Sequence, residues 1–172
     1  PQLDQSRVRQ SFRRGLLSYH RTASVQADIA ARLAELLQAQ GAPERFEAAL
    51  EFGCGTCHLT RQLVQGFGVG SLLLNDLVPE AASALQETGG AAPVQARFQA
   101  GPVESLPLPH GLDLIASAST VQWIPDLPAL TARLAARLNP GGWLALSGFG
   151  RSQFRELAAL GSAAAAPRYL GA

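Results

Sequence analysis

Apolar and polar positions follow two different spacings along the chain. Between residues 4 and 40, apolar side chains recur every three to four positions, which predicts two helices in succession. Further along, short apolar runs typical of buried strands alternate with stretches of helical spacing. We predict strands at 46–52, 71–75, 94–98, 112–117 and 143–149, and helices at 58–65, 79–88, 127–138 and 152–160. This alternation predicts an α/β fold with a doubly wound, mostly parallel sheet whose ligand lies at the carboxyl ends of the strands.

Length and composition limit the class of protein. With 172 residues, of which 47% are apolar, the chain is long enough for one well-buried domain, and we predict a single domain over 1–172. The net charge of +1 gives no reason to expect a nucleic-acid partner. No apolar run approaches the length of a membrane span, so we expect a cytoplasmic protein without a membrane partner.

The strand predicted at 46–52 runs directly into a glycine-rich turn. Gly53 and Gly55 are separated by one residue, and helical spacing begins at once after His58. Glycine permits positive φ angles and close approach of a ligand, and the N–H groups at the start of a helix bind carboxylates or phosphates. The segment is therefore predicted to bind a nucleotide-type ligand, although a glycine turn that binds nothing has the same pattern.

The same turn contains Cys54, Cys57 and His58 in a Cys-x-x-Cys-His arrangement. This arrangement attaches haem in exported proteins, and a Cys-x-x-Cys pair between a strand and a helix can be a redox dithiol. The sequence shows no signal-peptide pattern and no methionine to serve as an axial ligand, which argues against haem. A redox dithiol leaves the two glycines and the preceding Glu51 without a role. It remains the alternative from another class of protein.

The second apolar run, 71–75, is followed by an acid, Asp76. An acid at the end of the strand that follows a glycine turn is placed to accept hydrogen bonds from both ribose hydroxyls of a nucleoside. An aspartate three residues before Pro79 can equally cap a helix. Both interpretations stay open on the spacing alone.

Several segments, in the same order along the chain, resemble the class I S-adenosylmethionine (SAM) dependent methyltransferases. The first motif of that family, its ribose-binding acid and its turn into the fifth strand are matched by Glu51-x-Gly53-x-Gly55, Asp76 and 138–146. Within the superfamily, the malonyl-acyl-carrier-protein O-methyltransferases of biotin synthesis are similar to this chain in the segments 11–29, 103–108 and 121–123. The resemblance implies a Rossmann-like methyltransferase fold with lid helices over 1–40 and a SAM-binding core over 46–160. It also implies that the C-terminal part usual in the family is missing.

The resemblance implies roles for individual residues. SAM would be the cofactor, S-adenosylhomocysteine (SAH) its product, and no metal ion is implied. The cofactor-binding residues are then expected to be Tyr19, Gln26, Glu51, Gly53, Cys54, Gly55, Thr56, Asp76, Leu77, Pro102, Val103, Glu104, Ser117 and Ala118. Tyr19 and Gln122 are expected to position the acceptor. Pro102 stands where the family commonly has an acid, so the adenine contacts are expected from the backbone of this segment or from Glu104.

The reaction that the resemblance implies is methylation of the free carboxylate of a malonyl thioester, carried by acyl carrier protein or by CoA, in a monomeric enzyme. A carboxylate is already anionic at neutral pH, so the reaction needs positioning rather than a general base. Arg151 and Arg168 are candidates for binding that carboxylate, and Arg13, Arg14 and Arg21 for attracting an acidic carrier protein. A methyltransferase of another small molecule and a methyltransferase-like fold that only binds a carrier protein are the alternatives within the same fold.

Overall fold

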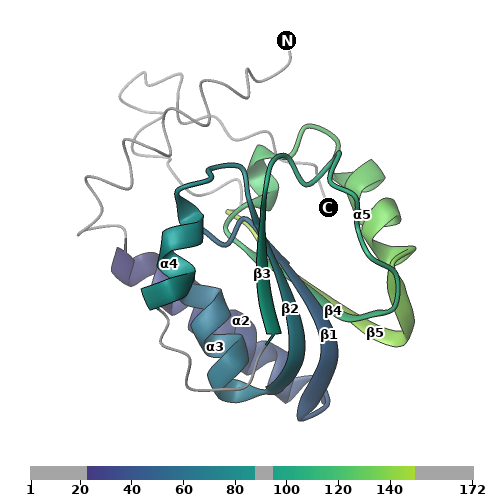
Figure 1. Ribbon diagram of the computed structural model, residues 1–172. Coiled ribbons are helices and arrows are strands. Elements are labelled where there is room, and N and C mark those ends of the chain that lie inside the picture. Colours follow the sequence, from purple (N-terminus) through teal and green to yellow (C-terminus); the bar gives the residue numbers. More distant parts are fainter. Residues whose placement is uncertain (1–22, 88–94, 150–172) are drawn as a thin grey trace.

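The computed structural model describes residues 23–87 and 95–149, and Figure 1 shows how their helices and strands are arranged. In chain order the elements are α2 (Ala23–Ala39), β1 (Arg45–Phe52), α3 (His58–Gly66), β2 (Gly68–Asp76), α4 (Ala81–Glu87), β3 (Gln95–Ala100), β4 (Leu112–Ala118), the 3-10 turn η1 (Val121–Trp123), α5 (Leu127–Ala135) and β5 (Leu138–Ser147). Strands and helices alternate, as the hydrophobic pattern predicted, except that β3 and β4 follow each other without a helix between them.

The strands form one five-stranded sheet in the order β3-β2-β1-β4-β5, with every neighbouring pair parallel. Helices α2, α3 and α4 cover one face of the sheet, and α5 covers the other (Figure 1). The predicted doubly wound parallel sheet is thus confirmed. The strand order reverses between β1 and β4, and ligands of such sheets bind at this reversal, beyond the carboxyl ends of the strands.

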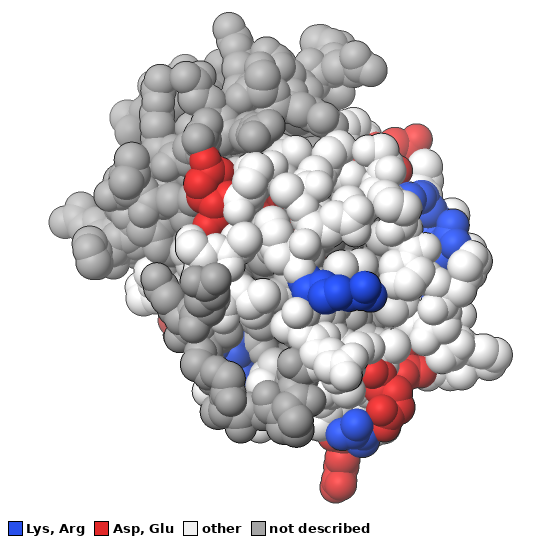
Figure 2. Space-filling model, in the orientation of Figure 1, with Lys and Arg blue, Asp and Glu red and all other residues white. Residues whose placement is uncertain are grey.

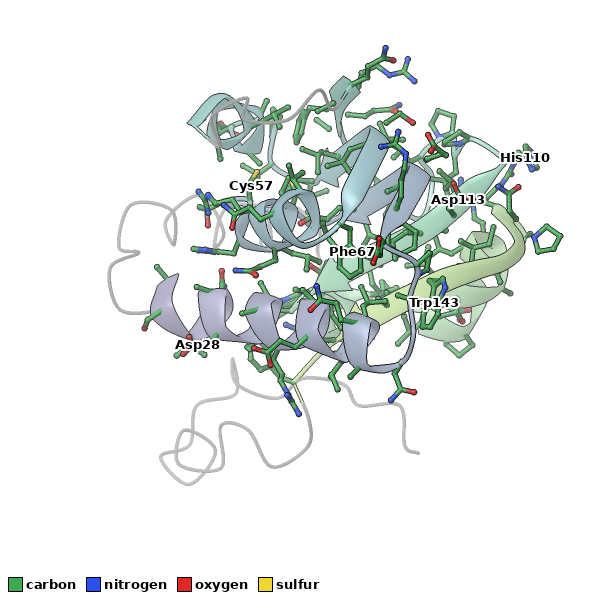
Figure 3. The ribbon with its side chains drawn as sticks, turned by 90° about the horizontal axis from the view of Figure 1, so that it is seen from below. Asp28, Cys57, Phe67, His110, Asp113 and Trp143 are labelled. Atoms are coloured by element: carbon green, nitrogen blue, oxygen red, sulfur yellow. The ribbon has the colours of Figure 1, made fainter. Side chains whose placement is uncertain are left out.

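The central strand β1 is buried on both sides, which explains its continuous apolar run. Phe46 packs in the core below α2 and α3, whereas Leu50 and Phe52 pack in the core on the α5 side. The Phe46 ring lies with its centroid 5.3 Å from that of Phe67, and Phe67 lies between the helices and the sheet (Figure 3). Two separate cores therefore fix β1 and, with it, the turn that follows.

Strand β2 is longer than predicted, because it begins at Gly68 rather than at residue 71. Gly68 pairs with Arg45 of β1. A Cβ at Gly70 would lie 2.7 Å from the carbonyl oxygen of Glu47, so only glycine allows the two strands to come this close. Glycine adds no apolar side chain to the pattern, and the first part of the strand was therefore missed.

The prediction of a helix to Leu138 followed by a turn at 139–142 was wrong. Helix α5 ends at Ala135, and β5 begins at Leu138, which pairs with Leu112 of β4. The register then shifts, since Leu114 pairs with Trp143, and the Asn-Pro-Gly-Gly segment forms an irregularity inside the strand. Leu138 is apolar because it packs beside β4. An apolar residue at this position would equally fit the buried face of a longer helix, so the spacing of apolar residues could not decide between the two.

Helix α2 confirms the second of the two predicted N-terminal helices, while the first of them and the helix at 152–160 lie outside the described residues. In the two described ranges, no helix is both long and apolar enough to cross a membrane. The face seen in Figure 2 carries a few positive and negative side chains, some of them adjacent, on a mostly uncharged surface.

Candidate functional site

The turn between β1 and α3 has a left-handed backbone, as its glycines predicted. The φ angles of Gly53, Gly55 and Cys57 are +65°, +51° and +64°. The Cys57 N–H donates to the Cys54 carbonyl at 2.8 Å, which closes the turn immediately before α3. The hydroxyl oxygen of Thr56 is buried and has no hydrogen-bond partner in the part of the chain that the structure describes. A buried hydroxyl without a partner, beside the start of a helix, leaves a polar group free for a ligand.

The end of β4 packs directly against this turn. A Cβ at Gly53 would lie 2.0 Å from Thr120 Oγ1, so Gly53 leaves room for the Thr120 side chain. The buried hydroxyl of Ser117 donates to the Phe52 carbonyl at 2.7 Å and ties the end of β4 to the end of β1. Ser119, between these two residues, has φ +61°, which is rare for a residue with a side chain. Backbone strain of this kind is typical of functional sites.

Asp76 joins the end of β2 to the glycine turn. One of its carboxylate oxygens accepts the Gly55 N–H at 2.8 Å, and the other accepts the Val78 N–H at 2.9 Å. Burial raises the pKa of this carboxyl, and the hydrogen bonds from Val78 and Gly55 oppose that shift. The helix α4 begins only at Ala81, so the aspartate caps a turn rather than the helix itself. Each carboxylate oxygen keeps a further lone pair that can accept a ribose hydroxyl.

Glu51, the acid that precedes the turn, is buried between β1 and α3 and does not reach the surface of the turn. Its carboxylate accepts a hydrogen bond from the Thr60 hydroxyl of α3 at 2.6 Å, and the residue is 2% exposed. Its pKa is raised to about 8, chiefly by burial and also by the neighbouring Cys57 and Asp76, against the effect of the Thr60 hydrogen bond. Glu51 therefore links β1 to α3 on either side of the glycine turn.

We expect Glu51→Gln to change how stability depends on pH. The folded chain holds the Glu51 proton more tightly than the unfolded chain, so the contribution of this carboxyl is fully present below its ordinary pKa of 4.5 and is lost as pH rises to about 8. Relative to the glutamine variant, the wild-type free energy of unfolding should fall between pH 5 and pH 8. Urea unfolding at several pH values measures this, with the exposed Glu44→Gln as control. Parallel curves for wild type and Glu51→Gln would contradict the assignment.

The two cysteines are free thiols, and both are buried, with exposed fractions of 5% for Cys54 and 0% for Cys57. The Cys54 thiol is hydrogen-bonded to the Cys57 sulfur, which raises the pKa of Cys54 and lowers that of Cys57 to about 7. The sulfur with thiolate character is thus the one without access to solvent, which disfavours a redox role in this conformation. Among the described residues no group of three or more His, Cys, Asp or Glu side chains is placed to hold a metal ion.

The segment 101–108 connects β3 to β4 and lies along α5 (Figure 1). Side chains of Val103, Leu106 and Leu108 are buried in the core on the α5 side. One guanidinium group, that of Arg133 in α5, donates to the Val103 carbonyl at 2.7 Å and also to the Leu106 carbonyl. Sequence reasoning missed Arg133, because nothing in the spacing of α5 separates it from an arginine on a solvated helix face.

Asn75 links the same segment to the glycine turn. Its side-chain amide donates to the backbone carbonyls of Gln99 and Gly101, each at 2.9 Å, and the backbone carbonyl of Asn75 accepts the Cys54 N–H at 3.1 Å. The residue is 2% exposed. Sequence reasoning missed this role too, although a signal was present: an amide at the end of a buried apolar run must have hydrogen-bond partners.

Gln122 lies in η1 and is 8% exposed. Its Nε2 donates to the Ser119 carbonyl at 2.8 Å, and its Oε1 is buried without a hydrogen-bond partner in the described ranges. One amide hydrogen is therefore already used to hold the strained Ser119. The expected contact of Gln122 with the methyl acceptor stays a prediction. Trp123, the next residue, is 36% exposed.

Most of the residues predicted to bind a cofactor follow the carboxyl ends of neighbouring strands. They are Glu51 and Gly53–Thr56 on β1 and its turn, Asp76 and Leu77 at β2, Pro102–Glu104 after β3, and Ser117 and Ala118 at the end of β4. Because the strands are parallel, these ends share one edge of the sheet. Gln26 lies in the first turn of α2. Tyr19 and the candidate arginines 13, 14, 21, 151 and 168 lie outside the described residues.

A parallel sheet with a glycine turn after β1 and an acid at the end of β2 defines a nucleotide-cofactor-binding fold of the doubly wound class. A family model described as "Methyltransferase domain" matches residues 49–142, from β1 to the irregular part of β5. The matched range is more than half of the 172-residue chain. The chain belongs to this methyltransferase family, and its fold is the Rossmann-like fold of class I methyltransferases.

Curated relatives with the name malonyl-[acyl-carrier protein] O-methyltransferase are similar to nearly the whole chain. A relative from Prosthecochloris aestuarii is 37% identical over 163 residues, which are 94% of this chain and 61% of the relative. A relative from Chlorobium luteolum is 38% identical over 159 residues, which are 91% of this chain and 60% of the relative. The chain therefore spans about three fifths of the length of these relatives.

Solved structures share the fold at low sequence identity. The N-methyltransferase NodS from Bradyrhizobium japonicum, in complex with SAH, has a TM-score of 0.62 and 21% identity, covering 80% of this chain and 71% of that one. SAM-bound CalS10, an amino pentose methyltransferase from Micromonospora echinaspora, has a TM-score of 0.58 and 22% identity, covering 74% and 52%. At this identity the likeness establishes the fold alone.

Proposed function

We propose that the chain binds SAM and acts as a SAM-dependent carboxyl O-methyltransferase. The observation that carries the proposal is the position of Asp76, whose carboxylate accepts the Gly55 N–H at 2.8 Å. The acid expected to bind the ribose and the turn expected to bind the methionine part therefore form one continuous surface. The hydroxyl of Thr56, which has no hydrogen-bond partner within residues 23–87 and 95–149, offers a further polar contact on the same turn. These groups fit a nucleoside joined to an amino acid, which is the composition of SAM.

When bound, SAM supplies an electrophilic methyl group on a positively charged sulfur. The turn itself, Gly53–Thr56, and the adjacent Ser117–Thr120 are all uncharged, and the acid that contacts the turn, Asp76, is assigned to the ribose and not to the methyl group. A carboxylate acceptor and a sulfonium lose their opposite charges as the methyl moves, so strongly charged neighbours would stabilise the reactants more than the transition state. The chain's contribution is then to orient the acceptor and exclude water, without a general base.

We assign the acceptor to the malonyl thioester class, with malonyl-acyl carrier protein in biotin synthesis as the first candidate. In this proposal the enzyme is a cytoplasmic monomer. Support comes from the shared name of the relatives and from their similarity across both described ranges. Malonyl-CoA is the second candidate. Gln122 belongs to the described part of the acceptor site in this proposal, and Tyr19 and the candidate arginines belong to the rest of it.

Calorimetric titration of the chain with SAM and SAH tests the cofactor. We expect a single site with a dissociation constant well below about 1 mM, and binding no tighter than that would overturn the proposal. Transfer of a labelled methyl group from SAM then tests the acceptor. We expect label on malonyl-acyl carrier protein and none on acetyl-acyl carrier protein, which lacks the free carboxylate. Label on another small molecule only would keep the cofactor and reject the acceptor.

A further inference from the structure

The turn between β4 and η1 holds Ser119 in the left-handed region, at φ +61°, which a serine rarely adopts. Hydrogen bonds hold the peptide planes on both sides of this residue. The Ser119 N–H, in the plane shared with Ala118, donates to the Ser147 carbonyl at 2.9 Å. The Ser119 carbonyl, in the plane shared with Thr120, accepts a hydrogen bond from Gln122 Nε2 at 2.8 Å. One backbone contact and one side-chain contact thus fix the conformation of Ser119.

The Gln122 side chain is itself held in a defined place. It is 8% exposed, and its amide nitrogen must face Ser119 because a carbonyl oxygen can only accept a hydrogen bond. Within residues 23–87 and 95–149, Gln122 gives the only hydrogen bond to the peptide plane between Ser119 and Thr120. Removal of the amide would therefore leave that plane without its directional contact.

Thr120, which follows in the chain, shapes the glycine turn. A Cβ at position 53 would lie 2.0 Å from Thr120 Oγ1, 2.6 Å from its Cγ2 and 2.8 Å from its Cβ. The Thr120 side chain thus occupies the space beside Gly53, and its hydroxyl lies 3.4 Å from the Gly53 carbonyl. In the same peptide plane, the Cys54 N–H donates to the Asn75 carbonyl at 3.1 Å. The plane between Gly53 and Cys54 is therefore held from the β4 side and from the β2 side.

The position of Thr120 depends on the conformation of Ser119. A change of Ser119 to a negative φ would redirect the chain that follows and move Thr120 away from Gly53. Serine favours that change, whereas glycine populates positive and negative φ about equally. The hydrogen bonds to Ser147 and from Gln122 oppose it. Three residues in succession thus connect Gln122 to the shape of the glycine turn.

We propose that Gln122 is a positioning residue for the cofactor: by holding Ser119 in the left-handed conformation, it keeps Thr120 against Gly53 and so sets the affinity of the glycine turn. The inference rests on the proposed binding of SAM. In this role Gln122 acts through Ser119 and Thr120, and the role is separate from its expected contact with the methyl acceptor. A residue predicted to serve the acceptor thereby also controls binding of the methyl donor.

The test is a double-mutant cycle with SAH as the ligand. Calorimetry gives its dissociation constant for wild type, Gln122→Met, Ser119→Gly and the double variant. Methionine is about as long as glutamine but has no amide, so it keeps the packing and removes the hydrogen bond. We expect Gln122→Met to weaken SAH binding about three- to tenfold. In the Ser119→Gly background the same replacement should weaken it less than about twofold, because glycine adopts the left-handed conformation without support.

Gln38→Met is the matched control. Gln38 Nε2 also donates to a backbone carbonyl, that of Gly66 at 3.4 Å, at the end of α3 away from the glycine turn. Its replacement should leave the affinity for SAH unchanged. Urea unfolding shows whether each variant is folded under the conditions of the titration. If Gln122→Met does not fold, Gln122→Asn takes its place in the cycle, since the shorter amide cannot reach the Ser119 carbonyl.

The backbone N–H signal of Cys54 in the NMR spectrum of the ligand-free protein gives a second readout. It should shift between wild type and Gln122→Met, and much less between Ser119→Gly and the double variant. A loss of packing alone would move the signal equally in both pairs.

The outcomes separate the two proposals. Failure of the wild-type chain to bind SAH would reject the proposed function and, with it, the inference. Binding of SAH by wild type, with equal losses from Gln122→Met in the Ser119 and Ser119→Gly backgrounds, would overturn the inference alone and leave Gln122 a packing residue. An unchanged affinity of Gln122→Met would overturn it equally.

Discussion

Gly53→Ala is expected to abolish measurable SAH binding and to lower stability by about 2–4 kcal/mol. Two effects add. The φ angle of +65° is unfavourable for alanine, and the new Cβ would lie 2.0 Å from Thr120 Oγ1 and 2.8 Å from Thr120 Cβ. Thr120 is β-branched and stiff, so it cannot move aside without displacing the end of β4. Calorimetry with SAH and urea unfolding measure the two losses.

Alanine variants at two other glycines show how much of the loss comes from the positive φ angle and how much from the contact with Thr120. Gly55 has φ +51° and Gly41 has φ +84°, and a Cβ at either position would meet no atom within 4 Å. Both alanine variants should lose about 1–2 kcal/mol of stability through strain alone. Gly41 lies between α2 and β1, so Gly41→Ala should keep the wild-type affinity for SAH. If Gly53→Ala were no worse than Gly41→Ala, the close contact with Thr120 would not be what shapes the turn.

Asp76→Ala is expected to have the second largest effect, on both folding and binding. The Gly55 and Val78 N–H groups would lose their acceptor, and each buried unpaired donor costs about 1–3 kcal/mol. Binding of SAH loses in addition the contacts to the ribose, about 1.5–3 kcal/mol, or at least tenfold in affinity. Asp76→Asn keeps only one acceptor, since its amide nitrogen would face the other N–H. Its stability and its affinity for SAH should therefore lie between those of wild type and Asp76→Ala.

Asp113 provides the matched control, because it is also a carboxylate that holds backbone donors. Its Oδ2 accepts the N–H groups of Glu47 and Ala48 at 3.1 and 3.0 Å, near the amino end of β4 (Figure 3). The Asn139 amide and these N–H groups lower the pKa of Asp113, which shows that its ionised form is the one stabilised. Asp113→Ala should therefore reduce stability and leave SAH affinity intact. A ligand loss equal to that of Asp76→Ala would remove the evidence for ribose binding.

The order of strands and helices was predictable because it depends on burial alone. Strands covered on both faces, such as β1, need continuous apolar residues, and helices with one buried face need the 3.6-residue period. The glycine turn and Asp76 were predictable for a related reason, since backbone angles and strand ends restrict the residue type locally. These features follow from neighbours in the sequence, so the sequence by itself determined them.

The tertiary structure decided which polar groups meet. Thr120 against Gly53, Asn75 with Gly101, and Arg133 with Val103 join residues that are 67, 26 and 30 positions apart. Such contacts are set by register and by helix placement, and the residue types involved are equally common on solvated surfaces. The same limit explains why the start of β2 and the Asn-Pro-Gly-Gly irregularity of β5 were misplaced. Glycine and proline leave no apolar pattern, and only pairing with the neighbouring strand shows that these residues belong to the sheet.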